Sequence, residues 1–157
     1  MTQRTGLDRL DRKLLAAVQK DAARTNAALA EEIGLSPSSC LRRLQRLKAE
    51  GVLLKTVALV APAALGRTLS AIVEVELDRH GEQHLRRFLE RARGEAAVTH
   101  AYAVTGEIDV ILMLRLVDMA EFHQICERLF RDATNVARFK TMFVTQTGKE
   151  ETALPVP

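Results

Sequence analysis

The period of the hydrophobic residues changes near residue 68, and this change constrains the fold more than any other feature of the chain. Before it, apolar residues recur at helical spacing, as in Leu10, Leu14 and Val18. After it, residues 68–78 alternate between apolar and polar side chains, which is the pattern of a half-buried strand. Since 157 residues are enough for two small domains, we expect a helical N-terminal part joined to a mixed part of different architecture.

The first sixty residues predict three helices followed by two short extended segments. Thr25 and Ser36 are good N-caps, because a hydroxyl oxygen accepts a free backbone N–H at a helix start. Asp8 or Asp11 can cap the first helix in the same way. Gly34 fits the turn between the second and third helices, since a residue without Cβ adopts positive φ easily. The predicted helices cover residues 8–20, 25–34 and 36–51, the extended segments 52–54 and 57–60, and the inward face of the third helix Cys40, Leu41, Leu44 and Leu47.

A helix, a tight turn and a second, arginine-rich helix make the outline of a helix-turn-helix, which sets its second helix into the DNA major groove. Arginine can pair with guanine or grip phosphate, Gln can contact adenine, and Ser contacts either. We expect Ser38, Ser39 and Arg42 to approach base edges, and Arg43 and Arg46 to bind phosphate together with Lys48. The full predicted DNA-binding set is Ser36, Ser38, Ser39, Arg42, Arg43, Gln45, Arg46 and Lys48.

The distribution of charge supports a nucleic-acid partner for the N-terminal part. Residues 1–60 hold 11 Lys and Arg against 6 Asp and Glu, whereas residues 61–157 hold 12 against 14. The alternative is an ordinary solvated basic face on a small helical bundle, because basic helix faces are common. The three-helix spacing and the Gly-Leu-Ser turn favour double-stranded DNA.

The remaining residues predict a β-α-β-β-α-β order, which is the ferredoxin-like arrangement. The chain is therefore expected to be α+β, with a winged helix-turn-helix before a ferredoxin-like βαββαβ sandwich. Two helices on one face of the sheet leave the other face bare, and a partly apolar bare face favours dimers. Strands are expected at 68–78, 97–105, 108–117 and 136–147, helices at 82–93 and 119–132. The predicted domains are 1–60 and 68–147, with a hinge at about 55–68, best placed at 61–66, and a tail at 148–157 that is mobile or wrapped on a partner.

Three separated motifs resemble the leucine-responsive regulatory protein / AsnC family of transcription regulators. The first is LDRLDRKLL at residues 7–15, and the second is GLSPSSCLRRL at 34–44 with GVL at 51–53. The third is VTGEID at 104–109, followed by Asp118-Met119. The resemblance extends from about Leu7 to Thr147, in order and with matching spacing.

This resemblance implies a regulator that senses an amino acid or a related molecule through its C-terminal domain. Family members dimerise sheet to sheet, and dimers commonly assemble into octamers or other rings. The effector is expected between dimers, near residues 106–109, where Gly106 lets the backbone approach, main-chain N–H groups hold a carboxylate and Asp109 holds an ammonium. The implied effector set is Tyr102, Gly106, Glu107, Ile108, Asp109, Met119, Met142 and Val144.

Two points limit that implication. Many members have a second acid and an aromatic residue where this chain has Glu107 and Ile108. The effector of a better-known member therefore does not transfer. By residue chemistry alone, Gly106 to Asp109 make an ordinary hairpin turn.

Other chemistries lack their motifs, so we expect no enzyme, cofactor or metal. The four histidines have no zinc spacing, and no P-loop, dinucleotide fingerprint or nucleophile elbow occurs. Cys40 and Cys126 are expected to be buried free thiols, and the strands lack the paired aromatics that stack RNA bases. No apolar run approaches the about 20 residues of a membrane span, and no signal peptide begins the chain. We therefore expect a cytoplasmic, nucleoid-associated regulator, with an effector-independent architectural DNA-binding protein as the alternative.

Overall fold

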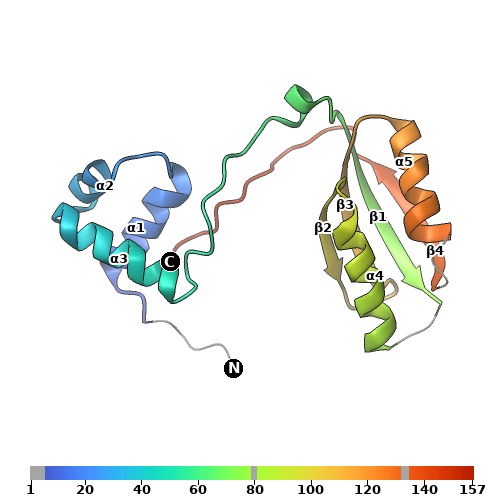
Figure 1. The fold of residues 1–157 in the computed structure, drawn as a ribbon, viewed down its shortest axis with the longest axis horizontal. Helices are drawn as coiled ribbons and strands as arrows, with labels where there is room; N and C mark the ends of the chain where they lie inside the picture. Colours follow the sequence, from blue (N-terminus) through green and yellow to red (C-terminus); the bar gives the residue numbers. More distant parts are fainter. Residues whose placement is uncertain (1–5, 79–80, 132–134) are drawn as a thin grey trace. The chain divides into compact units, whose positions relative to one another are not determined.

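The computed structural model describes residues 6–78, 81–131 and 135–157, and the chain forms two compact units (Figure 1). The first unit combines the chain up to Leu59 with Lys149–Pro157, and the second is Val60–Gly148. The chain therefore leaves the first unit after Leu59 and returns to it after Gly148.

Three short helices form the body of the first unit: α1 (Arg9–Lys20), α2 (Asn26–Ile33) and α3 (Pro37–Ala49). The predicted caps are present, because Asp8, Thr25 and Ser36 each accept a backbone N–H at the start of their helix. Gly34 has φ 74°, which gives the left-handed turn between α2 and α3. Leucine and alanine side chains from all three helices fill the core, with Leu14 and Leu47 fully buried.

Two details of this unit differ from the sequence prediction. Leu41, expected to face inward, is 47% exposed, because the buried stripe of α3 is narrow and centres on Cys40 and Leu47. Residues 52 and 53 lie in a bend whose amides bond back to Leu47 of α3, and residues 54–60 form no strand, so the described chain lacks the wing that was expected. A short 3₁₀ helix, η1 (Pro62–Leu65), occupies the segment expected to be the hinge.

The second unit is a four-stranded antiparallel sheet with two helices on one face (Figure 1). Its strands are β1 (Leu69–Leu77), β2 (Val98–Ala103), β3 (Val110–Leu116) and β4 (Val136–Phe143), in the order β2-β3-β1-β4. The helices are α4 (Glu82–Gly94) and α5 (Met119–Cys126), and a π-helical turn, η2 (Glu127–Arg131), continues α5. The predicted α+β class and βαββαβ order are confirmed.

Alternation along the two central strands places the core under the helices. The residues of β1 and β3 that face α4 and α5 are buried, with Val73 paired to Leu112 in the register. Phe88 of α4 and Ile125 of α5 close this core from the other side. Burial of an apolar side chain of this size stabilises the fold by about 1.5–3 kcal/mol.

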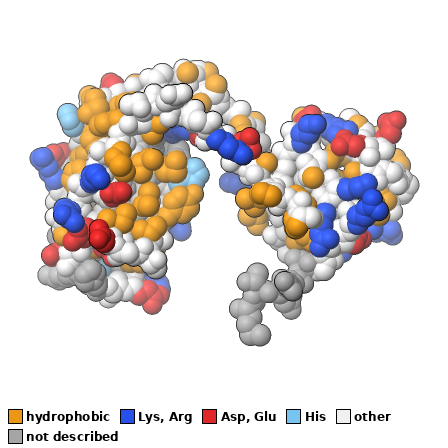
Figure 2. Space-filling view, turned by 180° about the vertical axis from the view of Figure 1, so that it is seen from behind, with side chains coloured by type: hydrophobic (Ala, Val, Ile, Leu, Met, Phe, Trp, Pro, Cys, Tyr) orange, Lys and Arg blue, Asp and Glu red, His pale blue; other side chains and the backbone are white. Residues whose placement is uncertain are grey.

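The opposite sheet face, which we call the open face, carries no helix. Apolar residues gather at its middle, where Ile72 pairs with Met113 and Met142. Charged residues follow toward the end of β1, with Glu74 beside Lys140 and Glu76 beside Arg138. Figure 2, which turns the molecule to this side, shows the apolar surface of the second unit bordered by Lys, Arg, Asp and Glu.

Candidate functional site

The start of α3 is fixed by polar contacts that leave one side of the helix open. Ser36 Oγ accepts the Ser39 N–H at 3.3 Å, and Pro37 occupies the first turn, where no N–H is needed. Asn26 Nδ2 donates to the Pro37 carbonyl at 2.7 Å, which ties the start of α2 to the start of α3. These contacts cap α3 and join its first turn to the start of α2.

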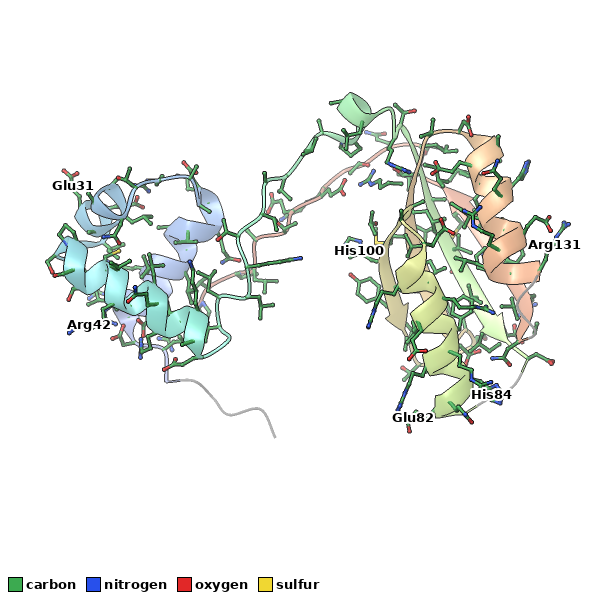
Figure 3. The ribbon with its side chains drawn as sticks, in the orientation of Figure 1. Glu31, Arg42, Glu82, His84, His100 and Arg131 are labelled. Atoms are coloured by element: carbon green, nitrogen blue, oxygen red, sulfur yellow. The ribbon has the colours of Figure 1, made fainter. Side chains whose placement is uncertain are left out.

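The exposed side of α3 carries most of the side chains that the sequence assigned to DNA. Arg42 lies on this surface (Figure 3), and its Nη2 is 3.4 Å from Ser39 Oγ. Among the described residues, Arg42 forms no ion pair. The predicted residues that are solvent-exposed are Ser36, Ser38, Arg42, Gln45, Arg46 and Lys48.

Arg43 and Arg46 face a different environment, because both bind carboxylates at the start of α1, where Asp8 is the N-cap and Asp11 lies in the first turn. Arg43 Nη1 lies 2.6 Å from Asp8 Oδ2 and 2.7 Å from Asp11 Oδ1. Arg46 Nη2 lies 2.6 Å from Asp11 Oδ2. We call these four residues the α1–α3 ion cluster. Sequence reasoning had given both arginines to phosphate and had considered Asp11 only as a helix cap.

Asp11 is the centre of this cluster and is fully buried. Burial raises the pKa of its carboxyl, but hydrogen bonds from Arg46, the Asp8 amide and Arg43 outweigh burial and hold the pKa below its usual value. The Asp11 amide, followed by Arg43, lowers the pKa of Asp8 in the same direction. The hydrogen bonds that both guanidinium groups donate to these carboxylates raise the pKa of Arg43 and of Arg46. All four groups are therefore charged at neutral pH.

In the second unit, the predicted effector turn joins β2 to β3 at the end of β1. Gly106 has φ 130°, a conformation that side chains with a Cβ rarely adopt. The turn is closed by a hydrogen bond of 3.0 Å from the Val104 N–H to the Asp109 carbonyl. Asp109 Oδ2 accepts the Leu77 N–H at 2.8 Å, so its carboxylate holds the end of β1 in place.

A cavity of about 260 Å³ lies beside this turn on the open face. Its walls carry charges of both signs, and the acidic and basic side chains pair across it. Arg138 Nε is 2.7 Å from Glu76 Oε2, and Lys140 Nζ is 3.7 Å from Glu74 Oε2. The lining residues of this cavity, which we call the turn pocket, are Glu74, Glu76, Glu107, Ile108, Arg138, Phe139 and Lys140.

The other predicted effector residues do not gather at the turn pocket within one chain. Tyr102 of β2 lies two strands away from Glu74, because Ile111 of β3 pairs with both residues. Met142 lies further along the open face, opposite Ile72. Val144 and Met119 lie beyond the opposite end of the sheet, where the Val144 N–H donates to the Ser70 carbonyl. The basic residues Arg138 and Lys140 were missed, although their alternation on β4 could have placed them on the open face.

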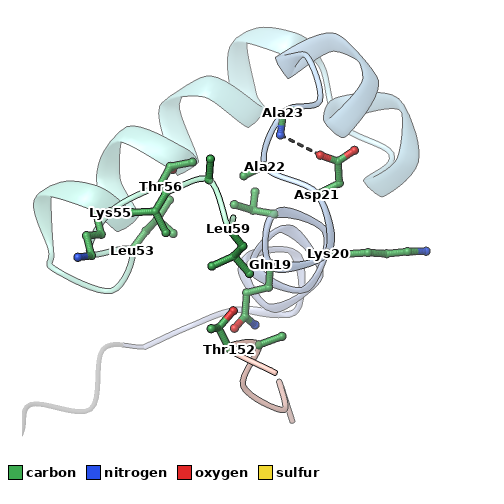
Figure 4. Close-up of a pocket in the computed structure, with 14 residues that line it drawn as sticks. Gln19, Lys20, Asp21, Ala22, Ala23, Leu53, Lys55, Thr56, Leu59 and Thr152 are labelled. Atoms are coloured by element: carbon green, nitrogen blue, oxygen red, sulfur yellow. Dashed lines mark hydrogen bonds between the residues drawn. The ribbon is translucent and has the colours of Figure 1, made fainter. Parts of the chain in front are cut away.

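The first unit has a hollow of its own, which the sequence did not predict. It is an open hollow of about 560 Å³ between the end of α1, residues 53–59 and the C-terminal tail (Figure 4). The Gln19 amide holds the tail, donating to the Leu154 carbonyl at 3.0 Å and accepting the Leu154 N–H at 2.7 Å. The tail therefore packs against α1 within the first unit. No sequence motif indicates this contact, because Gln19 bonds to main-chain groups.

Neither cysteine has the environment of a reactive thiol. Cys40 and Cys126 are unpaired and buried, as expected, and burial raises the pKa of each thiol. Within residues 6–78, 81–131 and 135–157, no cluster of three His, Cys, Asp or Glu side chains could hold a metal ion. Over the same residues, no helix is both long and apolar enough to cross a membrane.

Comparisons with known proteins give both units a family. Residues 7–48 match the AsnC-type helix-turn-helix domain, and residues 70–154 match the Lrp/AsnC ligand binding domain. An uncharacterized HTH-type transcriptional regulator of Sinorhizobium fredii is 40% identical over 150 residues, covering 96% of this chain and 89% of that protein. The DNA-binding transcriptional activator DecR of Escherichia coli is 31% identical over 96% of this chain and 99% of its own length.

Solved structures agree with this assignment. The crystal structure of a transcriptional regulator from Neisseria meningitidis, determined as a complex with L-Met, superposes with a TM-score of 0.89 at 32% identity, covering 95% of this chain and 96% of that one. The helix-turn-helix with its arginine-rich α3, the ferredoxin-like sheet and these likenesses lead to one conclusion. The chain belongs to the Lrp/AsnC family of DNA-binding transcriptional regulators.

Proposed function

We propose that this regulator binds a small amino acid at the turn pocket and that the bound amino acid changes how the assembled protein presents α3 to DNA. The observation that carries the proposal is the composition of the pocket, which places cations, carboxylates and an aliphatic side chain around one small cavity. A free amino acid needs these three kinds of partner for its carboxylate, its ammonium and its side chain.

The geometry supports specific roles for the pocket residues. Arg138 and Lys140, whose side chains are 77% and 71% exposed, are placed to receive the carboxylate of the effector. Their ion pairs with Glu76 and Glu74 lie at the surface, so these pairs contribute little to stability, and a ligand carboxylate can replace the glutamates. Glu107 of the turn is placed to receive the ammonium. We give this role to Glu107 in place of Asp109, because Asp109 already accepts the Leu77 N–H.

The neighbouring aliphatic side chain favours an effector with an apolar side chain. Ile108 is the apolar residue that the turn contributes to the pocket. The regulator from Neisseria meningitidis was solved as an L-Met complex, which makes methionine the first amino acid to test. The pocket volume suits a metabolite of this size, since cavities for drug-sized ligands begin at about 300 Å³.

Assembly is part of the proposal, because the open face supplies a natural contact between copies. The apolar middle of this face, around Ile72, Met113 and Met142, is unsuited to permanent exposure. A symmetric dimer through it would carry two α3 helices to half-sites about one helical turn apart, and dimers would then form an octamer or another ring. The chain would act in the cytoplasm, on the nucleoid, as a regulator and not as an enzyme.

Thermal unfolding of the full chain with each proteinogenic amino acid tests the effector. A ligand that binds only the folded state raises the midpoint, and the rise grows with its concentration. We expect Arg138→Ala to abolish the rise. Arg131→Ala is the matched control, because Arg131 is also an exposed arginine in an ion pair but lies on η2, away from the open face (Figure 3).

Footprinting on the region upstream of the protein's own gene tests the response of DNA binding. We expect the effector to change the footprint of the unaltered chain and to leave that of Arg138→Ala unchanged. If no amino acid raises the midpoint or alters the footprint, the proposal is wrong, and the effector-independent architectural role takes its place.

A further inference from the structure

The α1–α3 ion cluster holds two arginines of α3 in ion pairs, although a helix-turn-helix does not need such pairs in order to bind DNA. It places two carboxylates against two arginines of the helix that reads DNA, so the four groups together carry no net charge. We propose that Asp11 is a specificity-determining residue: it keeps Arg43 and Arg46 from binding DNA phosphates and leaves sequence-reading contacts to Arg42 and its exposed neighbours. This inference rests on the assignment of α3 as the DNA-binding helix.

The first step of the argument concerns how firmly Asp11 holds its partners. Asp11 Oδ1 accepts a hydrogen bond from Arg43 Nη1 at 2.7 Å, and Oδ2 accepts one from Arg46 Nη2 at 2.6 Å. Oδ2 also accepts the Asp8 N–H at 3.1 Å. No part of Asp11 reaches solvent. Since an uncompensated buried carboxylate is strongly unfavourable, a phosphate cannot take either arginine away without a large cost to Asp11.

The second step concerns what the cluster withholds from DNA. Each Lys or Arg that neutralises a phosphate adds to affinity for any sequence and makes binding steeper in salt. Arg43 and Arg46 are two of the four cations on α3, and their charges are already balanced by α1. Non-specific affinity is therefore lower than the arginine content of α3 suggests, which widens the ratio between operator and random DNA.

The third step separates Arg42 from the cluster. Arg42 precedes Arg43 in sequence and therefore points about 100° around the helix from it. It is exposed, and its nearest described polar partner is Ser39, at 3.4 Å. Arg42 thus has the charge and the freedom that pairing with a base edge requires.

Salt titration of binding to a short mixed-sequence duplex tests the proposal, with the full chain carrying Asp11→Asn. We expect Arg46 to be released, the slope of log affinity against log salt to steepen by about one per DNA-contacting protomer, and affinity near 0.1 M salt to rise roughly fivefold to tenfold. The same variant should discriminate less well between the upstream region of its own gene and the mixed duplex. A purely structural Asp11 would give weaker binding and no steeper slope.

A double variant, Asp11→Asn with Arg46→Gln, decides whether Arg46 touches phosphate in the unaltered protein. The cluster stays neutral in this variant, so we expect the slope of the unaltered chain. A slope lower by about one would show that Arg46 binds phosphate, and the proposal would be wrong.

Two further variants keep the test decisive. Asp8→Asn preserves the cap, since Asn caps as well as Asp, and it loosens Arg43 without burying an amide. We expect at most a small steepening, because Asp11 still holds Arg43 at 2.7 Å. A slope below that of the unaltered chain in folded Asp8→Asn overturns the proposal even if Asp11→Asn fails to fold. Glu31→Gln removes an equal charge from the exposed surface of α2 (Figure 3) and should leave the slope within about 0.3 of the unaltered chain.

Discussion

The α1–α3 ion cluster and the turn pocket both bring acids and bases together, but they do so in opposite surroundings. Asp11 is fully buried and receives two guanidinium groups, whereas the bases of the turn pocket are more than two-thirds exposed. A buried pair that loses one partner leaves an uncompensated charge, whereas an exposed pair exchanges its partner for water or an ion at little cost. The comparison teaches that ion pairs in this protein have two uses: one fixes a helix, and the other keeps a binding surface available.

Replacing the buried acid should have the largest effect. We expect Asp11→Ala to lower the free energy of unfolding by about 1.5–3 kcal/mol, because the protein loses the charged hydrogen bonds that Arg43 and Arg46 donate to Asp11. Urea unfolding followed by far-ultraviolet circular dichroism measures the change. Glu76→Ala, which breaks the exposed pair with Arg138, should cost less than about 1 kcal/mol. Equal losses for the two variants would remove the distinction between the clusters.

Acid should weaken the α1–α3 ion cluster. The pKa values of Asp8 and Asp11 lie below the ordinary 3.8 in the folded protein. Their contribution to stability is therefore complete above that pH and is lost as pH falls through the lower folded values. Unfolding free energies measured at decreasing pH should show this loss, and Asp8→Asn should make the loss smaller. The same acid dependence in Asp8→Asn as in the unaltered chain would contradict it.

A neutral contact at the start of α3 gives an intermediate effect. Ser36→Ala removes the oxygen that accepts the Ser39 N–H, and we expect a loss of about 1 kcal/mol. The control is Ser38→Ala, two residues further along the chain, which should change the free energy of unfolding by less than about 0.5 kcal/mol. Urea unfolding of both variants compares them, and an equal loss would mean that the cap does not hold α3.

The smallest change in stability should come from the turn pocket. Arg138→Ala breaks only the exposed pair with Glu76, so the free energy of unfolding should stay within about 0.5 kcal/mol of the unaltered chain. Chemical denaturation without any amino acid present checks this value. A loss above about 1 kcal/mol would make Arg138 a structural residue and would make its use as a binding variant unsound.

Local patterns were sufficient to predict most of the fold. Capping residues, Gly34 and the alternation along β1 act between near neighbours in the chain, and the helices and strands begin close to the predicted residues. The errors arose where packing decides. Leu41 has the hydrophobicity of a core residue but lies outside the narrow buried stripe of α3, and residues 52–60 have strand-like composition but no partner strand in the described chain.

The candidate sites divide along the same line. The sequence by itself determined the α3 surface and the Gly106 turn, because helical spacing and the need for positive φ can be read without knowing distant contacts. Only the tertiary structure decided that Arg43 and Arg46 bind Asp11, that Asp109 holds Leu77, and that Arg138 and Lys140 join Glu107 at one cavity. These contacts join residues about 30 positions apart, and the free energy of a charged side chain depends on which partner and how much solvent the folded chain leaves beside it.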